Sequence, residues 1–305
     1  LNHVKTLSSL NIDIGCVDSS PEKLNKIKSL FPNISCFDSI RESFEKDFQG
    51  YIIATPPSSH ADLAIRILSK GKPVLVEKPL SLSLSESKKI KIKINKYNGK
   101  LIVGHLMLFH PAIIKIKSMI DEGEIGKIQY IYSNRLNLGK VRTEENVFWS
   151  FAPHDISLFQ LFSKSFPSEV FSIGGDFLQK GIHDTTITYL KYPNGIQGHI
   201  YVSWLHPFRE HRLVIIGSKG TIHFEDSPNK KPLFFYEKDE SLSKKNIELK
   251  NKISKKIKYE EAPPLENELK YFIKIIKGDH IDKASIDEGI DVIKILEMAS
   301  NSLNP

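Results

Sequence analysis

The sequence predicts an α/β chain of two domains: a doubly wound parallel sheet over residues 1–106, lacking its first strand, and an α+β domain with a large, mostly antiparallel sheet over residues 107–305. Short apolar segments alternate with helical patterns up to residue 104, which is typical of a parallel sheet. From residue 127, longer segments rich in β-branched and aromatic residues are separated by Gly, Pro and Asn turns. The length of 305 residues also fits two domains.

The composition is that of a globular protein, with 40% hydrophobic and 26% charged residues. The sequence contains no apolar run long enough to cross a membrane and no signal segment, and we expect a cytoplasmic protein without a membrane partner. Cys16 and Cys36 lie in apolar runs and have no metal-site spacing, so we expect reduced core cysteines and no metal. The net charge is +7. The lysine-rich runs 88–96 and 244–258 lack interleaved aromatics, which favours solvated faces over a nucleic-acid site.

Helix and strand signals alternate through the first domain. Ser20 before Pro21 is an N-cap pattern, and Ser59 with Asp62 is a capping-box pattern. In 88–96, isoleucines alternate with lysines as in a strand, but the preceding serines and the place between two strands favour a helix. The expected strands are residues 12–18, 34–37, 51–54, 73–76 and 101–104, and the expected helices are 1–10, a segment from 20, a segment from 59 to 71, and 88–96.

Asp18 closes what would be the second strand of a dinucleotide-binding unit. An acid there would hydrogen-bond the ribose hydroxyls of NAD and repel the 2′-phosphate of NADP, so it predicts NAD as the cofactor; a turn aspartate is the alternative. The G-x-G-x-x-G turn that should open the unit is absent. We hypothesise an N-terminal truncation of about 15–20 residues, or else a degenerate domain. Without that turn we expect weak NAD binding or none.

Lys78 lies in Glu77-Lys78-Pro79, directly after the expected strand 73–76. Proline restricts the preceding residue to extended geometry, which holds Lys78 at the strand exit. Ligands of open parallel sheets bind beyond the carboxyl ends of the strands, and loss of solvent there could tune an amine for acid–base work. A surface lysine in a loop is the alternative interpretation.

The second domain is predicted to be a mostly antiparallel sheet of about six strands, covered by helices on one face. Tyr192-Pro193-Asn194-Gly195 is a strong hairpin signal between two of them. Residues 226–262 are charged and rich in turns, which favours an edge strand and a loop. An uncovered sheet face usually finds a partner, so we expect a homodimer or homotetramer formed through this sheet. The expected strands are 127–138, 169–176, 184–192, 196–204, 213–217 and 221–225, and the expected helices are 109–123, 265–277 and 286–303.

His154 follows a proline and precedes an apolar helical pattern, so we expect it near a helix N-terminus. There the helix dipole would depress its pKa and keep the imidazole neutral. A neutral imidazole can take the proton of an alcohol during a dehydrogenation. A lone histidine favours a structural role, but its pairing with Lys78 favours catalysis. Asp155 is expected to cap the helix or to orient His154.

Several motifs together resemble the Gfo/Idh/MocA oxidoreductase family over essentially the whole chain. The resemblance implies that Lys78 and His154 serve in catalysis. It also implies that Thr55, Pro56 and His60 line the nicotinamide and ribose side of an NAD site, to which we add Asp18, Glu77 and Lys78. Many members have an acid four residues before the histidine, which takes part in a proton relay. This chain has Ser150 at that position, so the relay is in doubt here. The motifs are Ala54-Thr55-Pro56-Pro57 with His60, Glu77-Lys78-Pro79, Gly104-His105, Phe109-His110-Pro111, Glu266-Asn267-Glu268-Leu269 with Phe272, and Asp287-Glu288-Gly289.

Residues 134–155 resemble one branch of that family, the dehydrogenases of UDP-N-acetylglucosamine uronate, in which the serine is the normal form. Those enzymes oxidise the sugar's C3 hydroxyl with NAD during the biosynthesis of sugars for surface polysaccharides. The resemblance therefore implies an anionic nucleotide sugar as substrate. The cationic side chains of Arg135, Lys140 and Arg142 could pair with the negative charges of such a substrate. A solvated strand end would explain these three residues as well. The substrate-site candidates are His105, Arg135, Asn137, Lys140, Arg142 and Asp155.

Two alternatives remain open at this point. The chain could oxidise another sugar or a polyol such as inositol. It could instead be a non-catalytic ligand-binding protein on the same fold, which the missing glycine turn supports. The presence of both Lys78 and His154 argues against the second alternative, because a sensor needs neither group.

Overall fold

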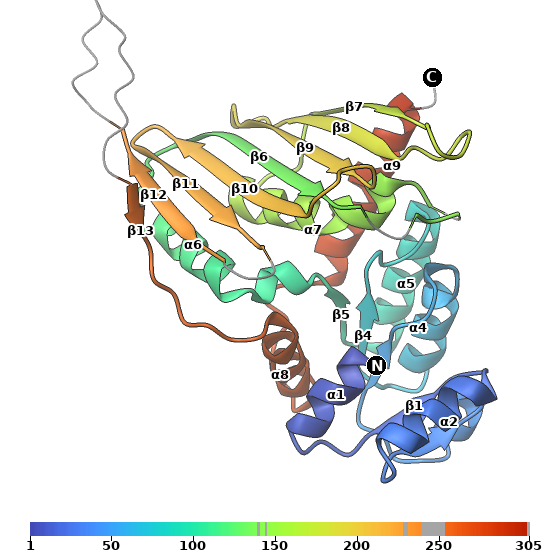
Figure 1. Ribbon diagram of the computed structural model, residues 1–305. Helices are drawn as coiled ribbons and strands as arrows, with labels where there is room; N and C mark the ends of the chain where they lie inside the picture. The colour runs from blue at the N-terminus through green and yellow to red at the C-terminus, as the bar shows by residue number, and fades with distance from the viewer. Residues whose placement is uncertain (139–140, 144, 228–230, 239–253, 304–305) are drawn as a thin grey trace, which may run out of the picture.

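The computed structural model describes residues 1–138, 141–143, 145–227, 231–238 and 254–303. Figure 1 shows a broad sheet with helices beneath it, and a smaller α/β part attached below those helices. A single apolar core runs through both parts, from β4 of the first domain to the strands of the large sheet. In the described chain no helix is long and apolar enough to cross a membrane.

The first domain contains parallel strands only, as the sequence predicts. β1 pairs with β2, and β3, β4 and β5 pair in that order, so the strands form two separate sheets. The carboxyl ends of β3, β4 and β5 therefore lie at one common edge. The strands are β1 Gly15–Val17, β2 Ser35–Phe37, β3 Tyr51–Ile53, β4 Val74–Glu77 and β5 Leu101–Gly104. The helices are α1 Asn2–Ser9, α2 Pro21–Leu30, α3 Ile40–Ser43, η1 Pro57–Ser59, α4 His60–Leu68 and α5 Leu84–Tyr97.

Two of the three helix signals in this domain behave as predicted. The Ser20 side chain accepts a hydrogen bond from the Lys23 backbone N–H and caps α2. The ambiguous segment 88–96 is part of α5: Ile90 is fully buried while Ile92 is 62% exposed, so the core contacts one helical face and not alternate residues. The predicted capping box at Ser59 is wrong, because the Ser59 side chain makes no capping hydrogen bond to α4. Ser59 Oγ instead donates to the carbonyl of Pro56, which lies 2.8 Å away and stabilises the turn before α4.

The second domain holds an eight-stranded sheet in the order β13-β12-β11-β10-β6-β9-β8-β7. β6 and β9 pair in parallel, and all other neighbours are antiparallel. The sheet exceeds the predicted six strands because residues 226–262 supply β12 and β13 where one edge strand was expected. The strands are β6 Ile128–Leu136, β7 Glu169–Gly175, β8 Thr185–Lys191, β9 Gln197–Ser203, β10 Glu210–Gly217, β11 Gly220–Glu225, β12 Leu233–Glu237 and β13 Ser254–Lys256. The predicted hairpin at Tyr192–Gly195 joins β8 to β9, with Gly195 at a φ of 87°.

Helices cover one face of this sheet, and Figure 1 shows α6, α7 and α9 on the same side of it. On the opposite face, β7 and β8 expose Phe171, Ile173 and Ile187, which are 56%, 57% and 45% exposed. The sheet is therefore one-sided within the described residues. The helices are η2 Leu106–Phe109, α6 Pro111–Asp121, α7 Val147–Ser163, α8 Pro264–Ile276 and α9 Ile286–Leu303.

The end of the chain returns to the first domain. The backbone N–H of Val103 in β5 donates to the carbonyl of Ala284, 2.8 Å away, just before α9 begins. Gly289 in α9 lies so close to β5 that a Cβ there would stand 2.7 Å from Cγ2 of Val103. This contact fixes β5, and with it the carboxyl edge of the parallel strands, against the second domain.

Candidate active site

Lys78 lies at the carboxyl end of β4 and reaches across to the second domain. Its Nζ donates a hydrogen bond to the backbone carbonyl of Ser150 in α7, 2.7 Å away. Burial lowers the pKa of Lys78 below its ordinary value, and the carboxylates of Glu77 and Glu145 act in the opposite direction. The amine is thus largely removed from solvent and directed at α7.

Pro153 lies inside α7, in the turn that follows Ser150. It has no N–H to donate to the preceding turn and crowds the carbonyl one turn earlier. The carbonyl that loses its helical donor is that of Trp149, the neighbour of Ser150. Lys78 supplies a donor to that turn from outside the helix.

His154 lies in the middle of α7 and not at its N-terminus. The helix begins at Val147, after Asn146, whose side chain accepts from the Trp149 backbone N–H. The predicted position was wrong because Pro153 was interpreted as a start signal, whereas here it lies inside the helix. The expected direction of the pKa shift holds, but its cause differs. Burial lowers the pKa of His154 well below its ordinary value, and the positive charges of Lys78 and Arg135 lower it further.

His105 follows β5 directly and stands beside the strand that carries Lys78, since Gly104 pairs with Glu77. Its side chain is 1% exposed, and burial together with the charge of Lys78 lowers the pKa of His105 to about 4. Both of its ring nitrogens, and Nδ1 of His154, are buried without a hydrogen-bond partner among the described residues. Buried polar atoms are normally paired, so these nitrogens indicate a place for a polar ligand.

Arg135 and Asp155 form a buried ion pair. Nε of Arg135 lies 2.7 Å from one carboxylate oxygen of Asp155, and Nη2 lies 3.1 Å from the other. Asp155 therefore holds the guanidinium of Arg135, which projects from β6, against α7. No described hydrogen bond joins Asp155 to His154. The prediction that Asp155 caps the helix or orients His154 is wrong, because Asp155 pairs with Arg135 instead. This ion pair also leaves Arg135 fewer N–H donors for a substrate.

Two functional candidates were missed in the sequence. His211 in β10 pairs with Arg135 in β6, and Arg135 Nη1 lies 3.4 Å from Nδ1 of His211. Arg209, at the end of the loop between β9 and β10, places Nη2 3.1 Å from the same nitrogen. In the sequence, Arg209 and His211 belong to a charged run, residues 209–212, just before an expected strand. Only the pairing of β10 with β6 brings these residues next to Arg135.

The residues expected near the cofactor gather around the carboxyl ends of the strands. Asp18 follows β1 and accepts a 2.9 Å hydrogen bond from the Ser20 backbone N–H, with Lys23 at 3.6 Å. His60 is buried, and its two ring nitrogens lie 2.9 Å from the Thr55 carbonyl and 2.8 Å from the Pro79 carbonyl. It therefore ties the Thr55-Pro56 turn to the residue after Lys78, while Thr55 and Pro56 stay exposed.

The remaining sequence candidates make other contacts. The Arg142 side chain is 55% exposed and lies 3.9 Å from Glu145. Asn137 is half-buried, and its backbone N–H donates to the Ser203 carbonyl. Lys140 lies outside the described residues. Glu77 places a carboxylate oxygen 2.9 Å from Nε2 of His3 in α1, and burial raises the pKa of Glu77.

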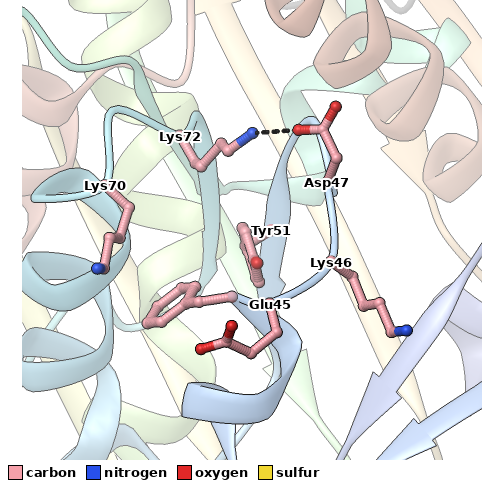
Figure 2. A pocket seen from close by; sticks show the side chains of 7 residues that line it. Glu45, Lys46, Asp47, Tyr51, Lys70 and Lys72 are labelled. Carbon is pink, nitrogen blue, oxygen red and sulfur yellow. Dashed lines mark hydrogen bonds and ion pairs between the residues drawn. The ribbon is translucent and has the colours of Figure 1, made fainter.

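A separate pocket lies at the opposite edge of the parallel strands. Figure 2 shows Tyr51 and Lys72 in this pocket, with the Lys72 side chain directed at Asp47. Tyr51 begins β3, Lys72 lies just before β4, and the distance from Lys72 Nζ to Asp47 Oδ1 is 3.1 Å. Lys78 is at the other end of β4, so this pocket is not part of the Lys78 and His154 site. Its remaining lining residues are Phe44, Glu45, Lys46 and Lys70. No metal-binding cluster is found in the described ranges.

Two family models match the chain, one for each domain. The model described as an oxidoreductase family with an NAD-binding Rossmann fold matches residues 6–105. The model described as the Gfo/Idh/MocA C-terminal domain matches residues 113–223. The chain belongs to the Gfo/Idh/MocA oxidoreductase family. Its first domain is therefore the NAD-binding Rossmann domain of that family, as the resemblance implied.

Curated relatives include polyol dehydrogenases. The scyllo-inositol 2-dehydrogenase (NAD(+)) of Bacillus subtilis (strain 168) is 31% identical over 185 residues, which cover 56% of this chain and 53% of the relative. The inositol 2-dehydrogenase of Rhizobium meliloti (strain 1021) is 23% identical over 239 residues, 73% of this chain and 72% of the relative. The chain spans about half the length of several curated relatives that it matches.

Solved structures share the whole fold. UDP-N-acetylglucosamine 3-dehydrogenase GnnA from Acidithiobacillus ferrooxidans has a TM-score of 0.85 at 18% identity, over 99% of this chain and 93% of that one. The WlbA dehydrogenase from Bordetella pertussis, in complex with NADH and UDP-GlcNAcA, has a TM-score of 0.78 at 18% identity, over 99% and 92%. At these identities the likeness establishes the fold alone.

Proposed function

We propose that this Gfo/Idh/MocA chain is an NAD-dependent dehydrogenase that oxidises a sugar hydroxyl. The observation that carries the proposal is the hydrogen bond from Lys78 Nζ to the Ser150 carbonyl, one helical turn before His154. It brings an amine from the first domain and an imidazole from the second domain to the same place. Both side chains are partly buried, and burial lowers the pKa of each.

The residues supply the proton chemistry of an alcohol oxidation. Neutral His154 takes the proton of the hydroxyl while the hydrogen on the carbinol carbon leaves with its electron pair and a carbonyl forms. Lys78 donates a hydrogen bond to the reacting oxygen and fixes its position. NAD, when bound, supplies the acceptor for that hydrogen and its electron pair. Asp18 would hold the adenosine ribose, and Thr55, Pro56 and Glu77 would line the cofactor beside Lys78.

The site offers unpartnered polar groups to such ligands. The unpartnered nitrogens of His105 and His154 lie in a buried region next to Lys78, where a sugar hydroxyl could satisfy them. The exposed Thr55-Pro56 turn lies at the carboxyl ends of the parallel strands, where ligands of this architecture bind. These observations support catalysis over a non-catalytic ligand-binding role, which needs neither the amine nor the base.

For the substrate, we propose a UDP-N-acetylglucosamine uronate oxidised at C3, in the synthesis of sugars for surface polysaccharides. The cations Lys78, Arg135 and Arg209 support an anionic substrate. The GnnA and WlbA likenesses agree with a nucleotide sugar. The inositol dehydrogenase relatives support the alternative, a polyol or another neutral sugar.

A substrate panel separates these possibilities. Purified chain is supplied with excess NAD and, in turn, UDP-N-acetylglucosamine uronate, UDP-N-acetylglucosamine, glucose and myo-inositol, and NADH formation is followed by absorbance. The proposal expects the highest kcat/KM with the uronate. NADH formation from inositol or glucose, but not from the uronate, would overturn the substrate assignment while keeping the dehydrogenase.

We also propose that two copies of the chain associate through the open face of the large sheet. Eight strands spaced about 4.8 Å apart and about 20 Å long present roughly 700 Å² to a partner, close to the area that one partner buries in a stable interface. Aromatic and aliphatic side chains occupy that face, including Phe171, Ile173 and Ile187. Exposed apolar side chains gathered on one face of a sheet are typical of interaction sites.

A further inference from the structure

Two guanidinium groups meet at one imidazole beside the proposed active site. Nδ1 of His211 lies 3.4 Å from Nη1 of Arg135 and 3.1 Å from Nη2 of Arg209. An arginine can only donate, so Nδ1 accepts and the proton of a neutral ring is on Nε2. Burial and the two guanidinium charges lower the pKa of His211 to about 3, which agrees with a neutral ring.

The two arginines have different surroundings. Arg135 is 10% exposed and both oxygens of its partner Asp155 engage it. The Arg209 side chain is 40% exposed, and its described contacts are the 3.1 Å hydrogen bond to His211 and a 3.9 Å ion pair with Asp226. Asp226 is also held by Lys231 at 2.8 Å. Because a guanidinium has five N–H donors, Arg209 keeps donors that these described partners do not use, while Arg135 serves to position the ring.

The charge around this cluster is positive. Arg135, Arg209 and Lys231 face the two carboxylates of Asp155 and Asp226. Lys78 does not add to this excess, because the carboxylates of Glu77 and Glu145 lie close to it. A partly buried excess of positive charge without its own counter-ion favours an anion.

The cluster borders the catalytic pair. Asp155, which holds Arg135, is the neighbour of His154 along α7, and the charge of Arg135 lowers the pKa of His154. Arg135 and His211 are directly opposite each other in β6 and β10, so their side chains stand on the same face of the sheet, towards α7. Figure 1 shows β10 next to β6 above α7. A substrate whose hydroxyl reaches His154 can therefore place a second group at Arg209.

We propose that Arg209 and Nε2 of His211 form a subsite for an oxyanion of the substrate, at the loop between β9 and β10. The inference rests on the proposed function for the identity of the substrate, but the subsite stands on the geometry of this cluster. In a UDP-sugar uronate the oxyanion is either the sugar carboxylate or the diphosphate. Arginine suits both, because its planar fork donates two parallel hydrogen bonds.

Binding measurements test the subsite without requiring turnover. UDP-N-acetylglucosamine uronate and UDP-N-acetylglucosamine are titrated by calorimetry into the chain and into Arg209→Gln and His211→Gln. Arg66→Gln is the matched control, since Arg66 is 46% exposed and lies 3.7 Å from an aspartate on the outer helix α4. Thermal melting of each variant verifies that it folds, and Arg209→Lys keeps the charge but not the fork.

The expected result is about 10- to 100-fold weaker uronate binding for Arg209→Gln, with Arg66→Gln unchanged and partial recovery in Arg209→Lys. A loss confined to the uronate assigns the carboxylate to the subsite, and an equal loss for both ligands assigns the diphosphate. If Arg209→Gln binds each ligand as tightly as Arg66→Gln does, the proposed subsite is wrong. If NADH forms from no sugar in the panel while Arg209→Gln still loses affinity, the subsite stands and the proposed dehydrogenase activity fails.

Discussion

The ammonium nitrogen of Lys78 lies 2.7 Å from the carbonyl oxygen of Ser150. This one bond joins the end of β4 to the helix that carries His154, across the boundary between the two domains. The hydrogen bond from Val103 to Ala284 and the close approach of Gly289 hold the neighbouring strand in place from the other side. The predictions below test these relationships one by one.

Gly289→Ala should loosen the contact between α9 and β5. The added methyl would stand 2.7 Å from Cγ2 of Val103 and 3.2 Å from Cδ2 of Leu80, both in the core. Overpacking of this kind costs about 1–3 kcal/mol. Urea unfolding should show that loss, while Asn301→Ala at an exposed position of α9 should stay within about 0.5 kcal/mol of the unchanged chain. Equal stabilities of the two variants would contradict the tight packing.

His105 should make stability depend on pH. Its folded pKa of about 4 lies below the ordinary 6.5, so the unfolded chain takes up a proton that the folded chain does not accept. The stability from neutral His105 is present above pH 6.5 and is lost as the pH falls towards 4. Between pH 7 and pH 5 the loss is about 2 kcal/mol.

Urea unfolding of His105→Gln at pH 7 and pH 5 measures this contribution. The variant should lose less stability on acidification than the unchanged chain, by about 2 kcal/mol. His280→Gln, at an exposed position, is the control and should keep the full dependence. The same dependence in all three proteins would show that His105 is not buried as described.

Ile187→Arg should weaken self-association through the sheet. Ile187 is 45% exposed on the open face, so a charge there should disturb a dimer but not the monomer. Light scattering after size-exclusion chromatography should show a shift from dimer towards monomer. Leu30→Arg in α2, where leucine is 51% exposed, serves as the control and should leave the mass unchanged. A dimer that persists in Ile187→Arg would place the interface elsewhere.

The sequence predicts the elements well because most of them have local signals. The Ser20 cap and the hairpin before Gly195 depend on neighbouring residues only, and both are confirmed. The start of α7 was misplaced because Pro153 is usually found at the beginning of a helix. Here the buried Val147 and Phe148 extend the helix upstream, so packing decides its start.

The chemistry of the site depends more on tertiary pairing. Lys78 was found from its motif and His154 from its motif and the family resemblance. Nothing in the local sequence indicates that Asp155 would engage Arg135, or that β10 would place His211 opposite the same arginine. The parallel pairing of β6 with β9 also joins strands far apart in the chain, and the alternating pattern of each strand is compatible with several partners.

The most direct test of the account compares Lys78→Met with Lys72→Met. The two lysines flank the same strand β4, and Lys72 lies at the far edge, in the pocket of Figure 2. NADH formation is measured with excess NAD and the best sugar of the panel, and any weakness in NAD binding affects both variants alike. The account predicts that Lys78→Met lowers kcat at least about 100-fold while Lys72→Met keeps it. Equal kcat values in the two variants would contradict the assignment of Lys78 and His154 as the catalytic pair.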